Sequence, residues 1–198
     1  MEIFFLILDF IKLNVEINYF ITLLILFIYL FLHNSLSLPG GIIFFAASGY
    51  FYGIYIGFLI SIISLVLGSL FFFVYASLLL KKIFPEKYKN YSKKITTYIA
   101  DSSFEYLILI RMIPGPPLML QNLLLSTLNI KKTLFSLTTF IGFSPIVFVS
   151  VFFGYQLNNF NSLKSIIFSD IFSFEFIIFI FFIITLIFLK VFYKKKKN

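Results

Sequence analysis

The chain has 198 residues, of which 61% are hydrophobic, and its formal net charge is +8 at pH 7. Its mean hydropathy is +1.04, and its apolar stretches approach the roughly 20 residues needed to cross a bilayer, which excludes a sizeable soluble domain and predicts an all-α polytopic membrane protein. The absence of cysteine excludes disulfides, cysteine-ligated zinc, iron–sulfur clusters and thiol nucleophiles.

The first 16 residues contain acids at Glu2 and Asp9 and lack the basic start and small-residue cleavage site of a signal peptide. We expect residues 1–16 to form an interfacial amphipathic segment. A single membrane domain over residues 17–193 follows, and its first span covers residues 17–32. Residues 194–198 form a basic tail that we expect in the cytoplasm.

No charged residue occurs between residues 36 and 80, a stretch that is too long for one crossing. Two straight crossings would need a tight turn near Tyr55. We prefer a re-entrant hairpin over residues 38–52, which starts at Pro39-Gly40, followed by a full span over residues 54–80.

The second half of the chain repeats this theme of an apolar start, a Pro-Gly break and a polar exit. In chain order we expect a lysine-rich interfacial connector (81–103), a second broken segment (104–129), a span (133–155), a polar loop (156–170) and a last span (171–191).

The two broken segments and the spans after them resemble a diverged internal repeat. Pro39-Gly40 and Pro114-Gly115 are separated by nearly the same interval as Gly68 and Gly142. Each half therefore reads as a segment broken by Pro-Gly and followed by a span that contains a small residue.

Lysine placement predicts how these halves are oriented. The positive-inside rule assigns the lysines of residues 81–94, of residues 131–132 and of the tail to the cytoplasm. The halves then have opposite orientations, which predicts an inverted repeat of two re-entrant helical hairpins plus transmembrane helices, with a site near the midplane. This scheme needs a cytoplasmic N-terminus, although Lys12 is the only basic residue there beside three acids.

The chain's one arginine, Arg111, lies in an apolar run just before a Pro-Gly-Pro-Pro sequence. Proline has no N–H, and broken backbone at membrane depth is tolerated only where protein or water covers it. A guanidinium keeps its charge, its planar fork suits phosphate oxygens, and free N–H groups where a helix restarts favour the same anion. We therefore predict a substrate-binding site that includes Arg111, Pro114, Gly115, Pro117, Gln121 and Asn122.

The alternative interpretation is that Arg111 snorkels to the interface and the prolines only kink a helix. Two further pairs of residues also have two interpretations each. Pro39 and Gly40 either line the site, as counterparts of Pro114 and Gly115, or form a loop. Asp101 and Glu105 lie one turn apart and are either proton carriers or ion-pair partners of nearby lysines.

An intramembrane enzyme is not expected. His33 is the only histidine and has no Gly-x-Ser-x-Gly companion for serine-protease chemistry. The sequence has no histidine and carboxylate cluster for a metal and no phosphate-binding loop for ATP, so we expect neither a metal nor another cofactor.

Several of these residues resemble motifs of the DedA/VTT superfamily, also called the SNARE-associated Golgi protein family. The second-half motif matches Arg111, Pro114, Pro117, Asn122 and Gly142-Phe143-Ser144-Pro145, and the first-half motif matches Leu38-Pro39-Gly40 and residues 47–53. The resemblance covers about residues 36–155. The acid that bacterial DedA members carry after the first Pro-Gly is replaced by Gly41, which favours the VTT branch.

The resemblance implies two opposed re-entrant hairpins and the movement of phospholipids or polyprenyl phosphates. Our leading hypothesis is a lipid flippase or scramblase that holds a phosphate headgroup at Arg111. The alternatives are a proton- or ion-coupled small-solute transporter and a non-transporting membrane scaffold. We expect the protein to interact with membrane lipids and not with nucleic acid, and a homo-oligomer is possible. The expected location is a bacterial cytoplasmic membrane or otherwise a eukaryotic endomembrane.

Overall fold

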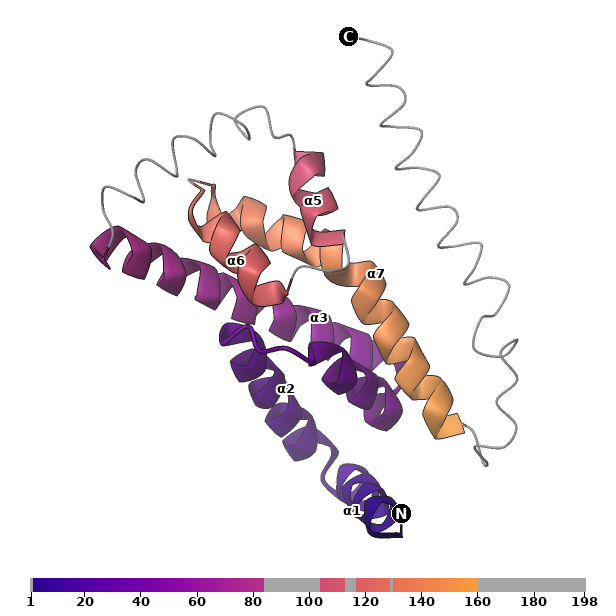
Figure 1. Ribbon diagram of the computed structural model, residues 1–198. Helices are drawn as coiled ribbons and strands as arrows, with labels where there is room; N and C mark the ends of the chain where they lie inside the picture. The colour runs from indigo at the N-terminus through magenta and orange to yellow at the C-terminus, as the bar shows by residue number, and fades with distance from the viewer. Residues whose placement is uncertain (1, 84–103, 113–116, 129, 160–198) are drawn as a thin grey trace, which may run out of the picture. The chain divides into compact units, whose positions relative to one another are not determined.

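The computed structural model describes residues 2–83, 104–112, 117–128 and 130–159, and the regular structure of these residues is entirely helical. The chain divides into two units, Met1–Asn158 and Asn159–Asn198, and the fold described below is that of the first. Its helices are α1 (Glu2–Ile17), α2 (Tyr19–Ser35), α3 (Gly41–Ile83), α5 (Phe104–Met112), α6 (Leu118–Ser126) and α7 (Lys132–Asn159) (Figure 1). The predicted last span and basic tail, and most of the connector and polar loop, lie outside the described residues.

Helix α3 is two limbs joined by a sharp break at Gly53, whose φ of 76° and ψ of 179° belong to a region that is essentially restricted to glycine. We call residues 41–52 the short limb and residues 54–83 the long limb. The limbs fold against each other, because the Ser48 hydroxyl lies 3.1 Å from the Gly57 carbonyl oxygen and 2.7 Å from the Ser61 hydroxyl. The break confirms the predicted division of this apolar stretch between residues 52 and 54.

The short limb pairs with α2 in an antiparallel hairpin. The rings of Tyr19 and Tyr52 lie 5.5 Å apart at one end, and those of Tyr29 and Phe44 lie 4.9 Å apart nearer the tip. The expectation of a hairpin contained within residues 38–52 is therefore wrong. Those residues supply one unbroken limb after a turn at 36–40, and α2 supplies the other limb.

Helix α2 ends beside the middle of the long limb and does not run along its whole length. A Cβ atom at Gly68, midway between Gly53 and Ile83, would lie 2.7 Å from the Cβ atom of Asn34 and 2.8 Å from the backbone nitrogen of Ser35. The absence of a side chain at Gly68 lets the tip of α2 approach the long limb this closely.

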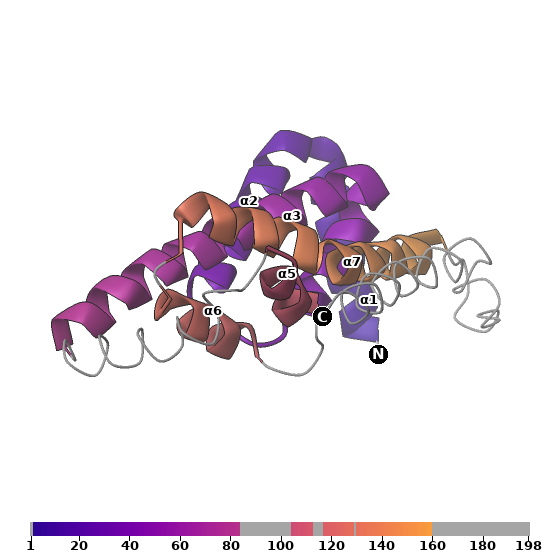
Figure 2. The same ribbon diagram turned by 90° about the horizontal axis from the view of Figure 1, so that it is seen from above.

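A second hairpin is formed by α5 and α6, which Figure 2 shows as two separate short helices. Leu107 of α5 and Leu125 of α6 belong to the same buried cluster, so the chain reverses between them. Each helix has nine residues and is about 14 Å long at 1.5 Å per residue. The predicted break in residues 104–129 is confirmed, while residues 113–116 lie outside the described part.

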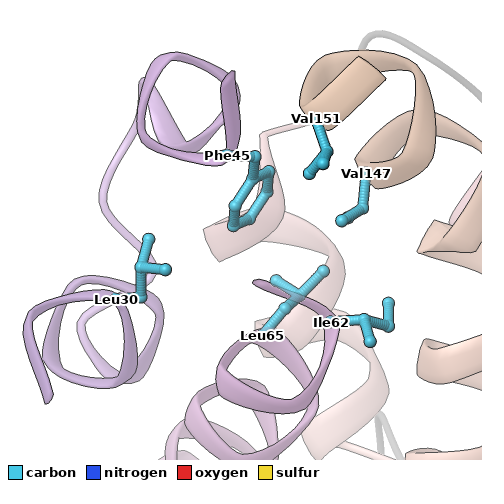
Figure 3. Close-up of a cluster of buried hydrophobic side chains, with 6 residues drawn as sticks. All are labelled: Leu30, Phe45, Ile62, Leu65, Val147 and Val151. Carbon is cyan, nitrogen blue, oxygen red and sulfur yellow. The ribbon is translucent and has the colours of Figure 1, made fainter. Parts of the chain in front are cut away.

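Helix α7 runs antiparallel to the long limb of α3. The rings of Phe73 and Phe135 lie 4.3 Å apart near one end of the pair, and those of Phe58 and Phe148 lie 5.9 Å apart towards the other. Figure 3 shows side chains from α2, both limbs of α3 and α7 meeting in one apolar core: Leu30, Phe45, Ile62, Leu65, Val147 and Val151.

Two of the described helices are long and apolar enough to cross a membrane, namely α3 and residues 132–158 of α7. Helices α1 and α2, which are bent by 117° relative to each other, would make a third if the pair is one span. Many large apolar side chains point outward, whereas buried side chains are polar about as often as apolar. This distribution suits a lipid environment, in which small and polar residues join helices.

Candidate functional site

Arg111 lies in the last turn of α5 and is only 2% exposed, which makes it one of the largest fully buried side chains among the described residues. Its Nη1 donates a hydrogen bond of 2.7 Å to Oδ1 of Asn122 in α6. Asn122 is itself fully buried. The second hairpin therefore brings together two of the residues that the sequence predicted for the site.

The hydrogen-bonded chain continues into the first half of the molecule. Nδ2 of Asn122 donates to the Ser37 hydroxyl at 3.0 Å, and that hydroxyl in turn donates to the Asn34 carbonyl oxygen at 3.3 Å. Ser37 has a φ of 50°, the one positive φ of a non-glycine residue in the described part of the chain. Its backbone strain is consistent with a position fixed by this contact between the two halves.

Two aromatic rings of α7 cover the guanidinium. Cζ of Arg111 lies 4.7 Å from the ring centroid of Phe135 and 5.4 Å from that of Phe143. Each such contact stabilises a desolvated cation by about 2 kcal/mol or more. The helix that carries the rings approaches closely because Gly142 faces the Cβ atom of Arg111, and any side chain there would overlap it.

Part of the guanidinium has no partner among the residues that the structure describes. In the described residues neither Nε nor Nη2 of Arg111 has a hydrogen-bond acceptor, and both atoms are buried. An uncompensated buried charge destabilises a protein by about 3–5 kcal/mol, which is of the same order as the contribution of the two ring contacts together. Nε and Nη2 are therefore the donors of this guanidinium that an external anion can bind.

The other predicted site residues are only partly gathered here. Gln121 is buried next to Asn122, whereas Pro117 is exposed as the residue before α6. Pro39 and Gly40 are exposed in the turn after α2, where the Pro39 carbonyl oxygen lies 3.3 Å from Nε2 of His33. Glu105 lies in the first turn of α5, away from the Arg111 end. Pro114, Gly115 and Asp101 lie outside the described residues.

The two halves make matching glycine contacts. A Cβ atom at Gly142 would meet the Cβ atom of Arg111 and lie 3.2 Å from the Ile108 carbonyl oxygen. A Cβ atom at Gly68 would likewise meet the Cβ atom of Asn34 and lie 2.9 Å from the Phe31 carbonyl oxygen. In each half, a glycine of the long helix thus faces a polar residue near the end of the helix that precedes the Pro-Gly sequence. The same glycine also faces the carbonyl group three residues before that polar residue.

Comparison with known proteins shows the family of the chain. The VTT domain model matches residues 38–156, which is more than half of the chain. The chain belongs to the VTT domain family. The boundaries agree closely with the predicted core of residues 36–155, and the predicted DedA/VTT relationship is confirmed.

A similar VTT family relative is the transmembrane protein 41 homolog of Dictyostelium discoideum, which is 31% identical over 147 residues. The match covers 72% of this chain but only 43% of the relative, so the chain spans less than half of that protein's length. No solved structure matches the chain significantly.

Pro39 and Gly40 are the residues of the first half that the sequence suggests for the site, whereas Ser37 and Asn34 are missed. Ser37 and Asn34 are short polar residues at the end of an apolar helix, and no motif in the sequence indicates a role for them at the site. Their polarity at the tip of α2 was the available signal. Phe135 and Phe143 carried no signal, because phenylalanine is abundant throughout the chain.

Proposed function

We propose that this protein is a lipid flippase or scramblase that moves a phosphate-bearing lipid headgroup across the bilayer and holds it at Arg111. The observation that carries the proposal is the buried guanidinium with two N–H groups that have no acceptor among the described residues. The movement of lipids that the VTT/DedA resemblance implies supports it.

The free atoms define how the headgroup binds. Because Asn122 occupies Nη1, the edge of the guanidinium that carries Nε and Nη2 is available. These two groups form a planar fork that accommodates two oxygens of one phosphate. The first N–H groups of α6 have no helical acceptor and favour the same anion, since α6 begins at Leu118, close in sequence to Arg111.

The lengths of the helices support a re-entrant arrangement. Helices α5 and α6 are each about 14 Å long, roughly half of the 30 Å hydrocarbon core, so neither crosses it alone. The tips of both hairpins lie beside the middle regions of the long helices, at Gly68 and Gly142. We propose that the hairpins enter from opposite faces as an inverted repeat and that their tips, with Arg111, lie near the midplane.

The finer identity of the substrate and its coupling are also proposals. A phospholipid and a polyprenyl phosphate share the chemistry that Arg111 recognises. Glu105, in the first turn of α5, and Asp101 are proposed as proton carriers. The protein is an integral membrane protein, and we propose a bacterial cytoplasmic membrane first and a eukaryotic endomembrane second.

The proposal is tested with purified protein in liposomes that contain tail-labelled lipids. A phosphate-headed lipid is compared with a sugar-headed lipid that has no phosphate, and each is compared with protein-free liposomes. We expect the protein to accelerate translocation of the phosphate-headed lipid selectively. Equal acceleration of both lipids would contradict recognition of phosphate. Uptake of a soluble anion without lipid movement would favour the small-solute transporter, and no transport of either kind would favour the scaffold.

A further inference from the structure

Four contacts near the ends of the helices show at which end of the molecule α1 lies. The first is the ring contact of Tyr19 with Tyr52, which places the start of α2 beside the Gly53 break. The second is the ring contact of Phe58, just after that break, with Phe148 in the second half of α7. The break and the C-terminal part of α7 therefore lie towards the same end of the molecule.

The third contact joins α1 to this end directly. Nζ of Lys12 donates a hydrogen bond of 3.1 Å to Oδ1 of Asn158, at the C-terminal end of α7. Val15 of α1 is 7% exposed and so packs against the protein. Helix α1 accordingly lies at the end of the molecule that contains Gly53 and Asn158.

The fourth contact fixes the opposite end. Phe73 and Phe135 pair at 4.3 Å, so the end of the long limb lies near the start of α7. The last turn of the long limb contains Lys81 and Lys82, and α7 begins at Lys132, directly after Lys131. The lysines of both long helices thus gather at the end away from α1, and the positive-inside rule assigns that end to the cytoplasm.

The side chains of α1 suit the other face of the membrane. Asp9, Lys12 and Glu16 give its described part no positive excess. An exposed apolar stripe runs along an adjacent face at helical spacing, with Phe10 68%, Leu13 54% and Ile17 68% exposed. Because α1 is bent by 117° from α2, it lies across the direction of the spanning helices. These are properties of a helix that lies in a membrane interface.

We propose that α1 is an interfacial helix on the extracytoplasmic face, or the lumenal face in an endomembrane, and that its Phe10–Leu13–Ile17 stripe inserts into the lipid of that leaflet. The first hairpin then enters from this face and returns to it. The inverted-repeat scheme drawn from the sequence needed a cytoplasmic N-terminal segment, and this proposal places that segment on the opposite face. The acids of α1 then no longer conflict with the positive-inside rule. This placement does not depend on whether the protein moves lipid.

The proposal is testable because the natural chain has no cysteine, so each single-cysteine variant reports one position. Asp9→Cys reports on α1 and Lys82→Cys on the lysine end, and both native residues are exposed. In spheroplasts treated with a membrane-impermeant maleimide, we expect labelling of Asp9→Cys in intact cells and of Lys82→Cys only after permeabilisation. Labelling of both variants from the same side would overturn the proposal.

A second measurement tests contact with lipid. Leu13→Cys and Asp9→Cys are coupled to a polarity-sensitive fluorophore in proteoliposomes. We expect blue-shifted emission and quenching by lipid-borne quenchers only at position 13. Equal, water-like emission at both positions would overturn insertion of the stripe. Both measurements are independent of transport, so their failure is distinguishable from failure of the lipid-transport proposal.

Discussion

Gly142 of α7 faces Arg111 of α5 so closely that a Cβ atom at position 142 would overlap the Cβ atom of the arginine. The position of the buried guanidinium therefore depends on the absence of a side chain in a neighbouring helix. This relationship gives the GFSP sequence at residues 142–145 a structural role beside the site.

Gly142→Ala should displace α7 from α5 and disturb the site. Overpacking of this kind destabilises a protein by about 1–3 kcal/mol, which we expect as a lower midpoint of thermal unfolding in detergent together with slower lipid translocation. Ile141→Ala is the matched control, because Ile141 is on the same helix and 41% exposed. Wild-type stability and transport in Gly142→Ala would show that the close approach is dispensable.

Arg111→Met should give a protein that is as stable as the wild type or more stable. Removing an uncompensated buried charge stabilises by about 3–5 kcal/mol, which offsets the loss of the ring contacts, about 2 kcal/mol or more, and the loss of the donor to Oδ1 of Asn122, about 1–3 kcal/mol. The measurement is the midpoint of thermal unfolding in nonionic detergent without added lipid. Added phosphate-headed lipid should raise that midpoint for the wild type only, since the variant has lost the cation that binds it. A large drop in the midpoint of the variant would indicate that Arg111 has a structural partner.

The Ser37–Asn122 hydrogen bond should couple the two halves energetically. We expect Ser37→Ala and Asn122→Ala each to destabilise the protein and the double variant to be less destabilised than the sum of the two. Contacting residues typically show a coupling of about 0.5–3 kcal/mol. The cycle is measured by unfolding of the four proteins under identical conditions. Strict additivity would mean that this contact does not join the halves.

Gly53→Ala should weaken the reversal between the limbs of α3. The φ of 76° and ψ of 179° at this position are strained for any residue with a side chain, by about 1–3 kcal/mol. Gly53→Asn should be impaired to a similar degree, because asparagine tolerates the left-handed helical region but not this one. Nothing lies within 4 Å of the added Cβ position, so backbone strain alone is tested. Unchanged unfolding midpoints in both variants would contradict the break at this residue.

The sequence was sufficient for the features that depend on local pattern. Apolar runs predicted the long limb of α3 and most of α7, and the prolines predicted the break between α5 and α6. Arg111 and Asn122 are near each other in sequence, so a reversal at the prolines was enough to predict that they meet.

The features that the sequence could not provide depend on contacts between distant segments. An apolar helix such as α2 has the same composition whether it runs along the whole long limb or ends beside its middle, and only its contact with Gly68 distinguishes the two. The hydrogen bond between Ser37 and Asn122 joins residues from opposite halves of the chain, and no sequence pattern around either residue predicts so distant a partner.

We propose that the Arg111 guanidinium holds the phosphate of a lipid in transit. The direct measurement is the translocation rate of a phosphate-headed lipid in proteoliposomes that contain the wild type, Arg111→Met, Arg111→Lys or, as a control for a lost exposed positive charge, Lys132→Met. We predict at least about a tenfold loss for Arg111→Met, which corresponds to about 1.4 kcal/mol. Arg111→Lys should be intermediate because it keeps the charge without the fork, and Lys132→Met should match the wild type. Translocation by folded Arg111→Met at the wild-type rate would contradict the account.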